Sequence, residues 1–109
     1  MEILGATSKL TKQLNNHSLL VRAYGADVAR RIEQRLFEFE NAVTLTEISH
    51  LPPPRLHSLT GDRSNQFAVD VSANWRLVFE GYNGKDELST TKSEIVTIQI
   101  LGIEDYHGR

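Results

Sequence analysis

The sequence predicts an α+β fold in which N-terminal helices pack on one face of a small antiparallel sheet. Apolar residues recur at helical spacing in the first half of the chain, whereas apolar and polar residues alternate in the second half. Three prolines at positions 52–54 separate the halves, and such a run favours extended backbone over helix. We therefore expect one domain over residues 1–109, with helices before the prolines and most strands after them.

Short elements are expected on either side of the main helix. Residues 2–4 suit a short strand, and Thr7 or Ser8 can cap a brief helix that ends at the Asn15-Asn16 pair. Residues 44–49 suit one further helical turn before the prolines.

After Gly25 the sequence predicts a long amphipathic helix that covers the sheet. Its apolar residues are four, four, three and four positions apart, which places them in one stripe. Its arginines at positions 30, 31 and 35 are interpreted as a solvated face balanced by nearby glutamates, because charge runs on helices are usually exposed. The stripe consists of Val28, Ile32, Leu36, Phe39 and Val43.

Residues 66–71 and 75–80 predict an antiparallel hairpin. Each segment alternates apolar with polar residues, and the short residues at positions 72–74 allow a tight turn between them. In this arrangement Arg76 shares the open face of the sheet with Asp70. The buried face consists of Phe67, Val69, Val71, Trp75, Leu77 and Phe79.

The last strand is expected over residues 94–103, which are rich in β-branched side chains. Gly102 suits a β-bulge that re-aims the end of this strand. The polar segment 81–93 is expected to be a long, mobile loop between the hairpin and this strand.

Polar side chains of one chemical kind gather on the open face of the predicted sheet. Arg55 and His57 alternate with Leu56, so an inward-facing Leu56 directs both toward the open side, where Arg76 also lies. Arginine binds anions through a planar fork of N–H donors. Two arginines and a histidine on an otherwise apolar surface therefore indicate anion chemistry.

Composition restricts the class of protein. The 109 residues are 39% hydrophobic and 24% charged, and the formal net charge of −2 argues against strong nonspecific nucleic-acid binding. No cysteine is present, the four histidines lack metal-site spacing, and we expect neither a metal nor a cofactor. No apolar run reaches the roughly 18 residues that a membrane span needs, and the first ten residues do not resemble a signal peptide. We expect a cytoplasmic protein.

Four ordered motifs together resemble the HigB-like branch of the RelE/ParE superfamily of bacterial toxins, also called plasmid maintenance system killer proteins. The resemblance covers the C-terminal half in motif and the whole chain in element order. The motifs are Arg55-Leu56-His57, Thr60-Gly61-Asp62-Arg63, Asn74-Trp75-Arg76 and Asp105-Tyr106-His107.

The resemblance implies a function and a set of partners. It implies the toxin of a type II toxin-antitoxin system, an endoribonuclease that enters the ribosomal A site, cuts mRNA and so inhibits translation. The implied partners are the ribosome, mRNA and a cognate HigA-like antitoxin with a helix-turn-helix domain, with which the toxin would form a hetero-oligomer.

Metal-independent RNA cleavage requires a base for the 2′-hydroxyl, an acid for the 5′-oxygen and positive charge near phosphorus. Histidine suits the proton transfers, and arginine suits the charge because its fork matches phosphate oxygens. We expect His57 and His107 to share the base and acid roles, with Asp105 orienting a histidine. Tyr106 would act as a proton donor or a base-stacking platform. The phosphate ligands would be Arg55, Arg63 and Arg76.

Structural roles for the same residues remain open alternatives. In these alternatives His57 is a structural histidine, Arg63 only closes its turn, and Arg76 pairs with Asp70 or Glu80 across the hairpin. His17 and His50 lie outside the motifs and are interpreted as surface residues. Trp75 is expected in the core.

Two other functions remain compatible with the sequence. One is a noncatalytic inhibitor of a protein target such as DNA gyrase, as in the ParE branch of the superfamily. The other is a degenerate member that retains only antitoxin binding, which the mildly acidic composition favours. His57 and the terminal Asp-Tyr-His distinguish a nuclease from both, because a binding protein does not need titrating groups on its open face.

Overall fold

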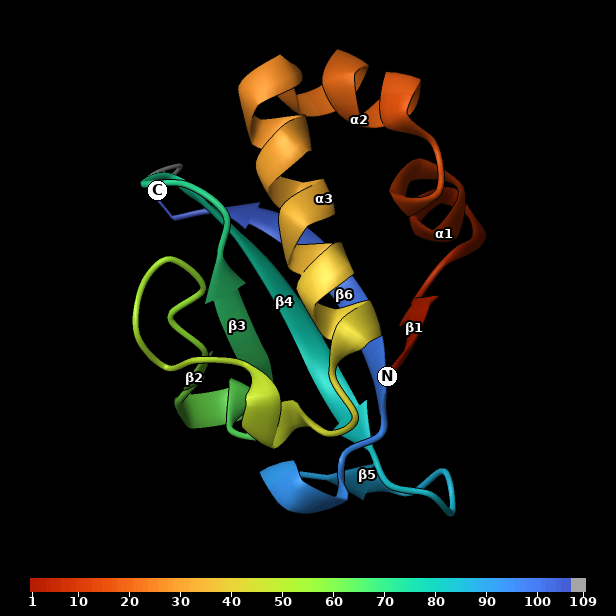
Figure 1. Ribbon diagram of the computed structural model, residues 1–109, viewed down its shortest axis with the longest axis vertical. Coiled ribbons are helices and arrows are strands. Elements are labelled where there is room, and N and C mark those ends of the chain that lie inside the picture. Colours follow the sequence, from red (N-terminus) through yellow and green to blue (C-terminus); the bar gives the residue numbers. More distant parts are fainter. Residues whose placement is uncertain (107–109) are drawn as a thin grey trace.

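Helices and strands divide the chain as the sequence predicts, with most of the sheet after the prolines (Figure 1). The computed structural model describes residues 1–106. The helices are α1 (Ser8–Leu14), α2 (His17–Tyr24) and α3 (Ala26–Asn41). The strands are β1 (Glu2–Gly5), β2 (His57–Ser58), β3 (Phe67–Asp70), β4 (Trp75–Tyr82), β5 (Leu88–Ser89) and β6 (Thr97–Asp105). Short 3-10 turns lie in the connections at Leu45–Glu47, Gly61–Arg63 and Lys92–Glu94.

The sheet has the strand order β1-β6-β4-β3-β2, and β5 pairs with β4 beside this path. β1 runs parallel to β6, whereas the other neighbouring strands are antiparallel. The α+β class is confirmed, but the sheet is mixed and not wholly antiparallel. The difference arises at one edge, where the first strand of the chain pairs with the last. The periodicity of each strand contains no information about this distant pairing.

Helix α3 lies across one face of the sheet (Figure 1) and follows the N-cap residue Gly25, whose φ of 85° favours glycine. Its buried residues are Ala29, Ile32, Arg35 and Phe39. Val43, which the sequence assigned to the apolar stripe, lies beyond the helix end and is 71% exposed. The interpretation of Arg35 as solvated is wrong, because its guanidinium is paired and packed beneath the helix. Apolar spacing alone cannot identify a buried arginine.

The core forms between α3 and the strands β3, β4 and β6. Phe79 stacks on Phe67 with ring centroids 5.7 Å apart and meets Phe39 edge to face at 5.1 Å. Trp75 was expected in this core, and it lies at the margin, half-buried against the edge of Tyr24 at 5.0 Å. One face of these strands is therefore covered by the helices, and the opposite face is left for other side chains.

The predicted hairpin of β3 and β4 is confirmed, with Phe67 opposite Phe79 and Asp70 opposite Arg76. On the face away from the helices, Ala68 and Val78 are also fully buried. The alternation that marks β3 and β4 thus places small or apolar residues at the centre of the open face. Its polar side chains lie on either side of that centre: Asp70 and Arg76 form one row, and Glu80 follows Val78 on the same face of β4.

A β-bulge in β6 decides which of its last residues share that row. Val78 pairs with Gly102 and Phe79 with Ile100, so one extra residue of β6 lies between these pairs. A one-residue slip reverses the face of every residue after it. The bulge predicted at Gly102 therefore places Glu104 opposite Arg76 on the open face.

The segment predicted as a long loop has more structure than expected. β4 extends to Tyr82, and β5 folds back to pair with it through Gly81 and Ser89. The side-chain oxygen of Asn83 accepts hydrogen bonds from the main-chain N–H groups of Lys85 and Glu87 at 2.9 and 3.0 Å. The Asn83 side chain thus closes a turn where composition suggested mobility.

Within residues 1–106, no helix has the length and apolar content required to cross a membrane.

Candidate functional site

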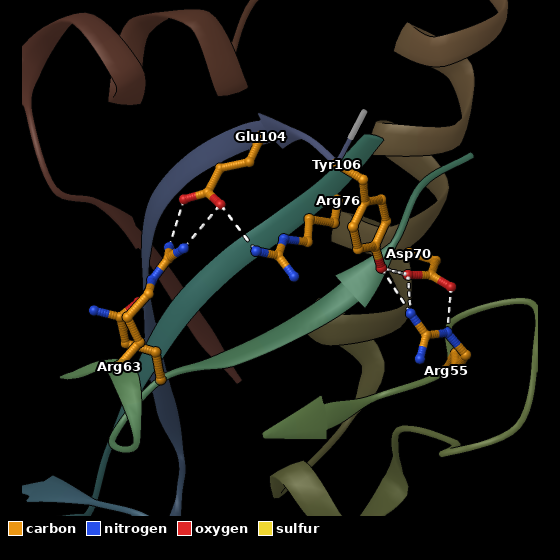
Figure 2. A network of polar contacts seen from close by, with 7 residues as sticks. Arg55, Arg63, Asp70, Arg76, Glu104 and Tyr106 are labelled. Carbon is orange, nitrogen blue, oxygen red and sulfur yellow. Dashed lines mark hydrogen bonds and ion pairs between the residues drawn. The ribbon is translucent and has the colours of Figure 1, made fainter. Parts of the chain in front are cut away.

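A network of charged side chains occupies one end of the open sheet face (Figure 2). Its members come from segments that are far apart in the sequence. These are the segment just before β2, the turn Gly61–Arg63, the strands β3, β4 and β6, and the residue after β6. They are the arginines Arg55, Arg63 and Arg76, the carboxylates Asp70 and Glu104, and the phenol of Tyr106.

Asp70 is the centre of the first half of this network. Arg55 donates from Nε to Oδ2 of Asp70 at 2.6 Å and from Nη2 to Oδ1 at 3.0 Å. The Tyr106 hydroxyl donates to Oδ1 of Asp70 and accepts a hydrogen bond from Arg55 Nη2 at 2.7 Å. The three groups therefore form a closed triangle at the end of β3.

The backbone of Arg55 is unusual, since its φ is 47°. Left-handed backbone costs roughly 1 kcal/mol or more for a residue other than glycine. The guanidinium of the same residue forms hydrogen bonds with Asp70 and Tyr106, and these bonds offset that cost. Strain of this kind concentrates at functional sites, which supports a role for this end of the sheet.

Glu104 is the centre of the second half. Arg63 reaches it with both terminal nitrogens, and the Nη1–Oε1 contact is 3.1 Å. Arg76 donates from Nη2 to Oε1 of Glu104 at 3.2 Å. Arg63 also donates from Nε to the side-chain oxygen of Gln66 at 2.9 Å, which fixes its position at the turn before β3.

Arg76 connects the two halves. Its guanidinium carbon lies 4.7 Å above the centre of the Tyr106 ring, a cation-π contact, while its Nη2 holds Glu104. The side chain is only 14% exposed. Its Nε atom is buried and has no hydrogen-bond partner among residues 1–106. Arg76 therefore has an unused donor inside the network.

The network changes the proton affinities of its members. Burial raises the pKa of Asp70, but hydrogen bonds from Arg55 and Tyr106 outweigh burial, and the net pKa lies below its ordinary value. The hydrogen bonds from Arg63 lower the pKa of Glu104 in the same way. Burial, then the hydrogen bond to Asp70, raises the pKa of Tyr106. Both carboxylates are therefore ionised at neutral pH, and the phenol keeps its proton.

His57 lies beside the network on β2. Its Nδ1 is 2.7 Å from the main-chain oxygen of Arg55, and because a carbonyl only accepts, Nδ1 must carry a proton and donate. In a neutral imidazole this leaves Nε2 as the acceptor. His57 pairs with Ala68 in the ladder and lies close enough to Asp70 to contribute to the lowered pKa of that carboxyl.

The structure brings together four of the expected site residues, namely Arg55, Arg63, Arg76 and Tyr106, with His57 next to them. Asp105 is the ladder partner of Trp75, so strand alternation assigns it to the face opposite Glu104. His107 lies outside the described residues 1–106, and its predicted role stays a prediction. His17 and His50 are exposed, as expected.

Sequence reasoning missed the two carboxylates that organise the site. Asp70 was considered only as a hairpin partner of Arg76, but it pairs with Arg55, and Arg76 pairs with Glu104. Arg63 does more than close its turn. Asp70 could have been predicted as a site residue, because strand alternation places it opposite Arg76 on the open face. Glu104 could not, because only the bulge in β6 places it on that face.

No cluster of three potential metal-ligating side chains occurs within residues 1–106. The two carboxylates at the site already hold guanidinium groups.

The fold is shared with a known toxin. The YoeB/ParE toxin from Agrobacterium tumefaciens superposes with a TM-score of 0.61 over 98% of this chain and 100% of that protein, at 12% sequence identity. At this identity the likeness establishes the fold alone. The class that it defines is therefore one of fold: an α+β protein built like that toxin, here with an arginine-rich open face.

Sequence similarity identifies the branch of that class. No family model matches the chain. Endoribonuclease HigB of Proteus vulgaris is 34% identical over 77 residues, which span 71% of this chain and 70% of the relative. The chain belongs to the HigB family.

Proposed function

We propose that this protein is the toxin of a type II toxin-antitoxin system and that it cleaves mRNA on the ribosome, thereby inhibiting translation in the cytoplasm. Its HigB relative is an endoribonuclease, and the chain has the fold of a YoeB/ParE toxin. The observation that carries the proposal is the convergence of Arg55, Arg63 and Arg76 around Tyr106 on one sheet face, beside His57. A cognate HigA-like antitoxin with a helix-turn-helix domain would hold the toxin inactive in a hetero-oligomer.

The arginines supply the positive charge that phosphate cleavage requires. Attack on phosphorus adds negative charge to the nonbridging oxygens, and guanidinium groups fixed in advance stabilise that charge without reorganisation. Arg76 is the best-positioned ligand, since it is largely buried and held by the Tyr106 ring, and its Nε donor has no partner within residues 1–106. Arg55 and Arg63 would hold the same or a neighbouring phosphate.

Proton transfer falls to His57, Tyr106 and His107. Nε2 of His57 would accept the proton of the 2′-hydroxyl as its oxygen attacks phosphorus. The bond from phosphorus to the 5′-oxygen then breaks, and Tyr106 or His107 would donate a proton to that oxygen. The products are a 2′,3′-cyclic phosphate and a 5′-hydroxyl end, so this route requires no metal. The family resemblance implies that Asp105 orients a histidine. Because Asp105 lies on the sheet face opposite Glu104, that histidine would be His107 and not His57.

Induced expression followed by mapping of mRNA 5′ ends tests the proposal. We expect growth arrest with cuts in translated mRNA, and cleavage of mRNA by purified protein only when ribosomes are present. Arg76→Ala should abolish the cuts, whereas the matched control Arg30→Ala, on the exposed face of α3, should not. Arrest without cuts would instead indicate inhibition of a protein target such as gyrase. Absence of arrest would indicate a member that retains only antitoxin binding.

A further inference from the structure

One carboxylate of this site accepts guanidinium contacts that a phosphate could also accept. Glu104 receives both terminal nitrogens of Arg63 and the Nη2 atom of Arg76. A carboxylate and a phosphate present pairs of anionic oxygens that match the same guanidinium fork. Arg63 and Arg76 therefore form a clamp for an anion, and in this structure the clamp holds the carboxylate of Glu104.

The clamp is imperfectly satisfied by Glu104. Arg76 Nε remains buried without a partner within residues 1–106, and a buried donor without an acceptor is unfavourable. A carboxylate has two oxygens, and Arg63 engages both of them. An anion with a tetrahedral arrangement of oxygens has more directions from which to accept, so it can approach Nε and Nη2 of Arg76 together.

Glu104 can also be displaced from the two arginines. Its side chain is 30% exposed and that of Arg63 is 38% exposed, so water and ligand can reach the ion pair. Partly exposed ion pairs contribute little to stability because water and salt screen them. Rotation of the Glu104 side chain would therefore release Arg63 and Arg76 without disrupting the strand that carries it.

The net charge of the network is small. The three arginines of the network face two ionised carboxylates, which leaves one net positive charge. Weak attraction for a single RNA phosphate follows, because affinity for nucleic acid depends on the number of unpaired cations that replace counterions.

We propose that Glu104 is an internal competitor of the RNA phosphate: it occupies the Arg63–Arg76 clamp in the free protein and must be displaced when RNA binds. Glu104 thereby sets the affinity of the site and makes free RNA a poor ligand. The inference rests on the proposed function for the identity of the ligand. It adds a residue that determines specificity without acting on the reacting atoms.

Fluorescence anisotropy tests this competition with a labelled single-stranded RNA hexamer that is 2′-O-methylated throughout and so cannot be cleaved. Full-length Glu104→Gln should bind about tenfold more tightly than wild type, and the salt dependence of log K should steepen by about one unit. The charge-matched control Glu94→Gln, at an exposed position in the turn before β6, should change affinity by less than about twofold.

Equal effects of Glu104→Gln and Glu94→Gln would overturn the proposal, since only overall charge would then matter. Weaker binding by Glu104→Gln would also overturn it, because Glu104 would then be a scaffold for the arginines. Glu104→Asp, which keeps the charge but shortens its reach, should have intermediate affinity and provides a folded comparison if the glutamine variant does not fold.

A second readout separates this inference from the proposed function. Inorganic phosphate should shift the side-chain Nε–H resonances of Arg63 and Arg76 at lower concentration in Glu104→Gln than in wild type. If that holds while no mRNA is cut in cells, the competition stands and the nuclease assignment falls. If mRNA is cut but neither RNA nor phosphate binds Glu104→Gln more tightly, the competition falls alone.

Discussion

Arg35 Nε, on helix α3, donates a 2.8 Å hydrogen bond to the main-chain oxygen of Asp70, on the strand that carries the site. The same guanidinium binds both oxygens of Glu38 through Nη1, at 2.9 and 2.8 Å. Arg35 is 5% exposed. One buried arginine therefore joins the helical layer to the residue around which the first half of the site is built.

Removal of Arg35 should destabilise the fold more than any other change of a helix arginine. Arg35→Ala removes the ion pair with Glu38 and the hydrogen bond to the Asp70 carbonyl, and we expect a loss of about 3 kcal/mol in the free energy of unfolding. The exposed control Arg31→Ala should stay within about 0.5 kcal/mol. Urea denaturation of both variants measures the difference, and equal midpoints would show that the buried pair is not stabilising.

Stability should fall in acid because of the site carboxylates. The ordinary pKa values of Asp70 and Glu104 are 3.8 and 4.5, and both are lowered in the folded protein. Their pairing is therefore fully present above those ordinary values and is lost as the pH falls through the lower folded-state values. In Asp70→Asn the free energy of unfolding should decline less steeply between about pH 5 and pH 2. A decline as steep as in wild type would contradict this role of Asp70.

His57 should control the acidic side of the rate profile. A general base acts only when it is deprotonated, so single-turnover cleavage should show a limb that rises with pH. His57→Gln should reduce the rate by roughly a hundredfold or more and remove this limb. The control His17→Gln alters an exposed histidine that pairs with Glu33 at 3.0 Å on the helices, and it should retain both rate and limb. Retention of the limb in His57→Gln would assign the base elsewhere.

Tyr106 should matter for chemistry more than for binding. Because its pKa is raised, the phenol remains protonated across neutral pH and can serve as a proton donor. Tyr106→Phe keeps the ring beneath Arg76 but removes the hydroxyl, so we expect roughly a hundredfold slower cleavage with little change in RNA affinity. Tyr82→Phe, whose hydroxyl donates to Glu80 at 3.1 Å, is the matched control. If Tyr106→Phe cleaves normally and Tyr106→Ala does not, the residue is a stacking platform.

Local patterns predicted the elements well and their partners poorly. Alternation in residues 66–71 and 75–80 was sufficient for the hairpin, because both strands and their turn lie within one short segment. The contact between Arg55 and Tyr106 joins residues 51 positions apart, and no short-range pattern contains it. The same limit explains why Arg76 was expected to meet Asp70 or Glu80 when it meets Glu104.

The amino-acid sequence by itself determined that the helices precede most of the strands, which face of the hairpin is apolar and which arginines are available for an anion, since these follow from periodicity and residue chemistry. Tertiary structure alone decided which charged side chains of the site form ion pairs with each other. A single extra residue in β6 places Glu104 on the face of Arg76 and Asp105 on the face of Trp75. Strand register depends on packing between distant segments, and it reverses the face of a side chain with a shift of one residue.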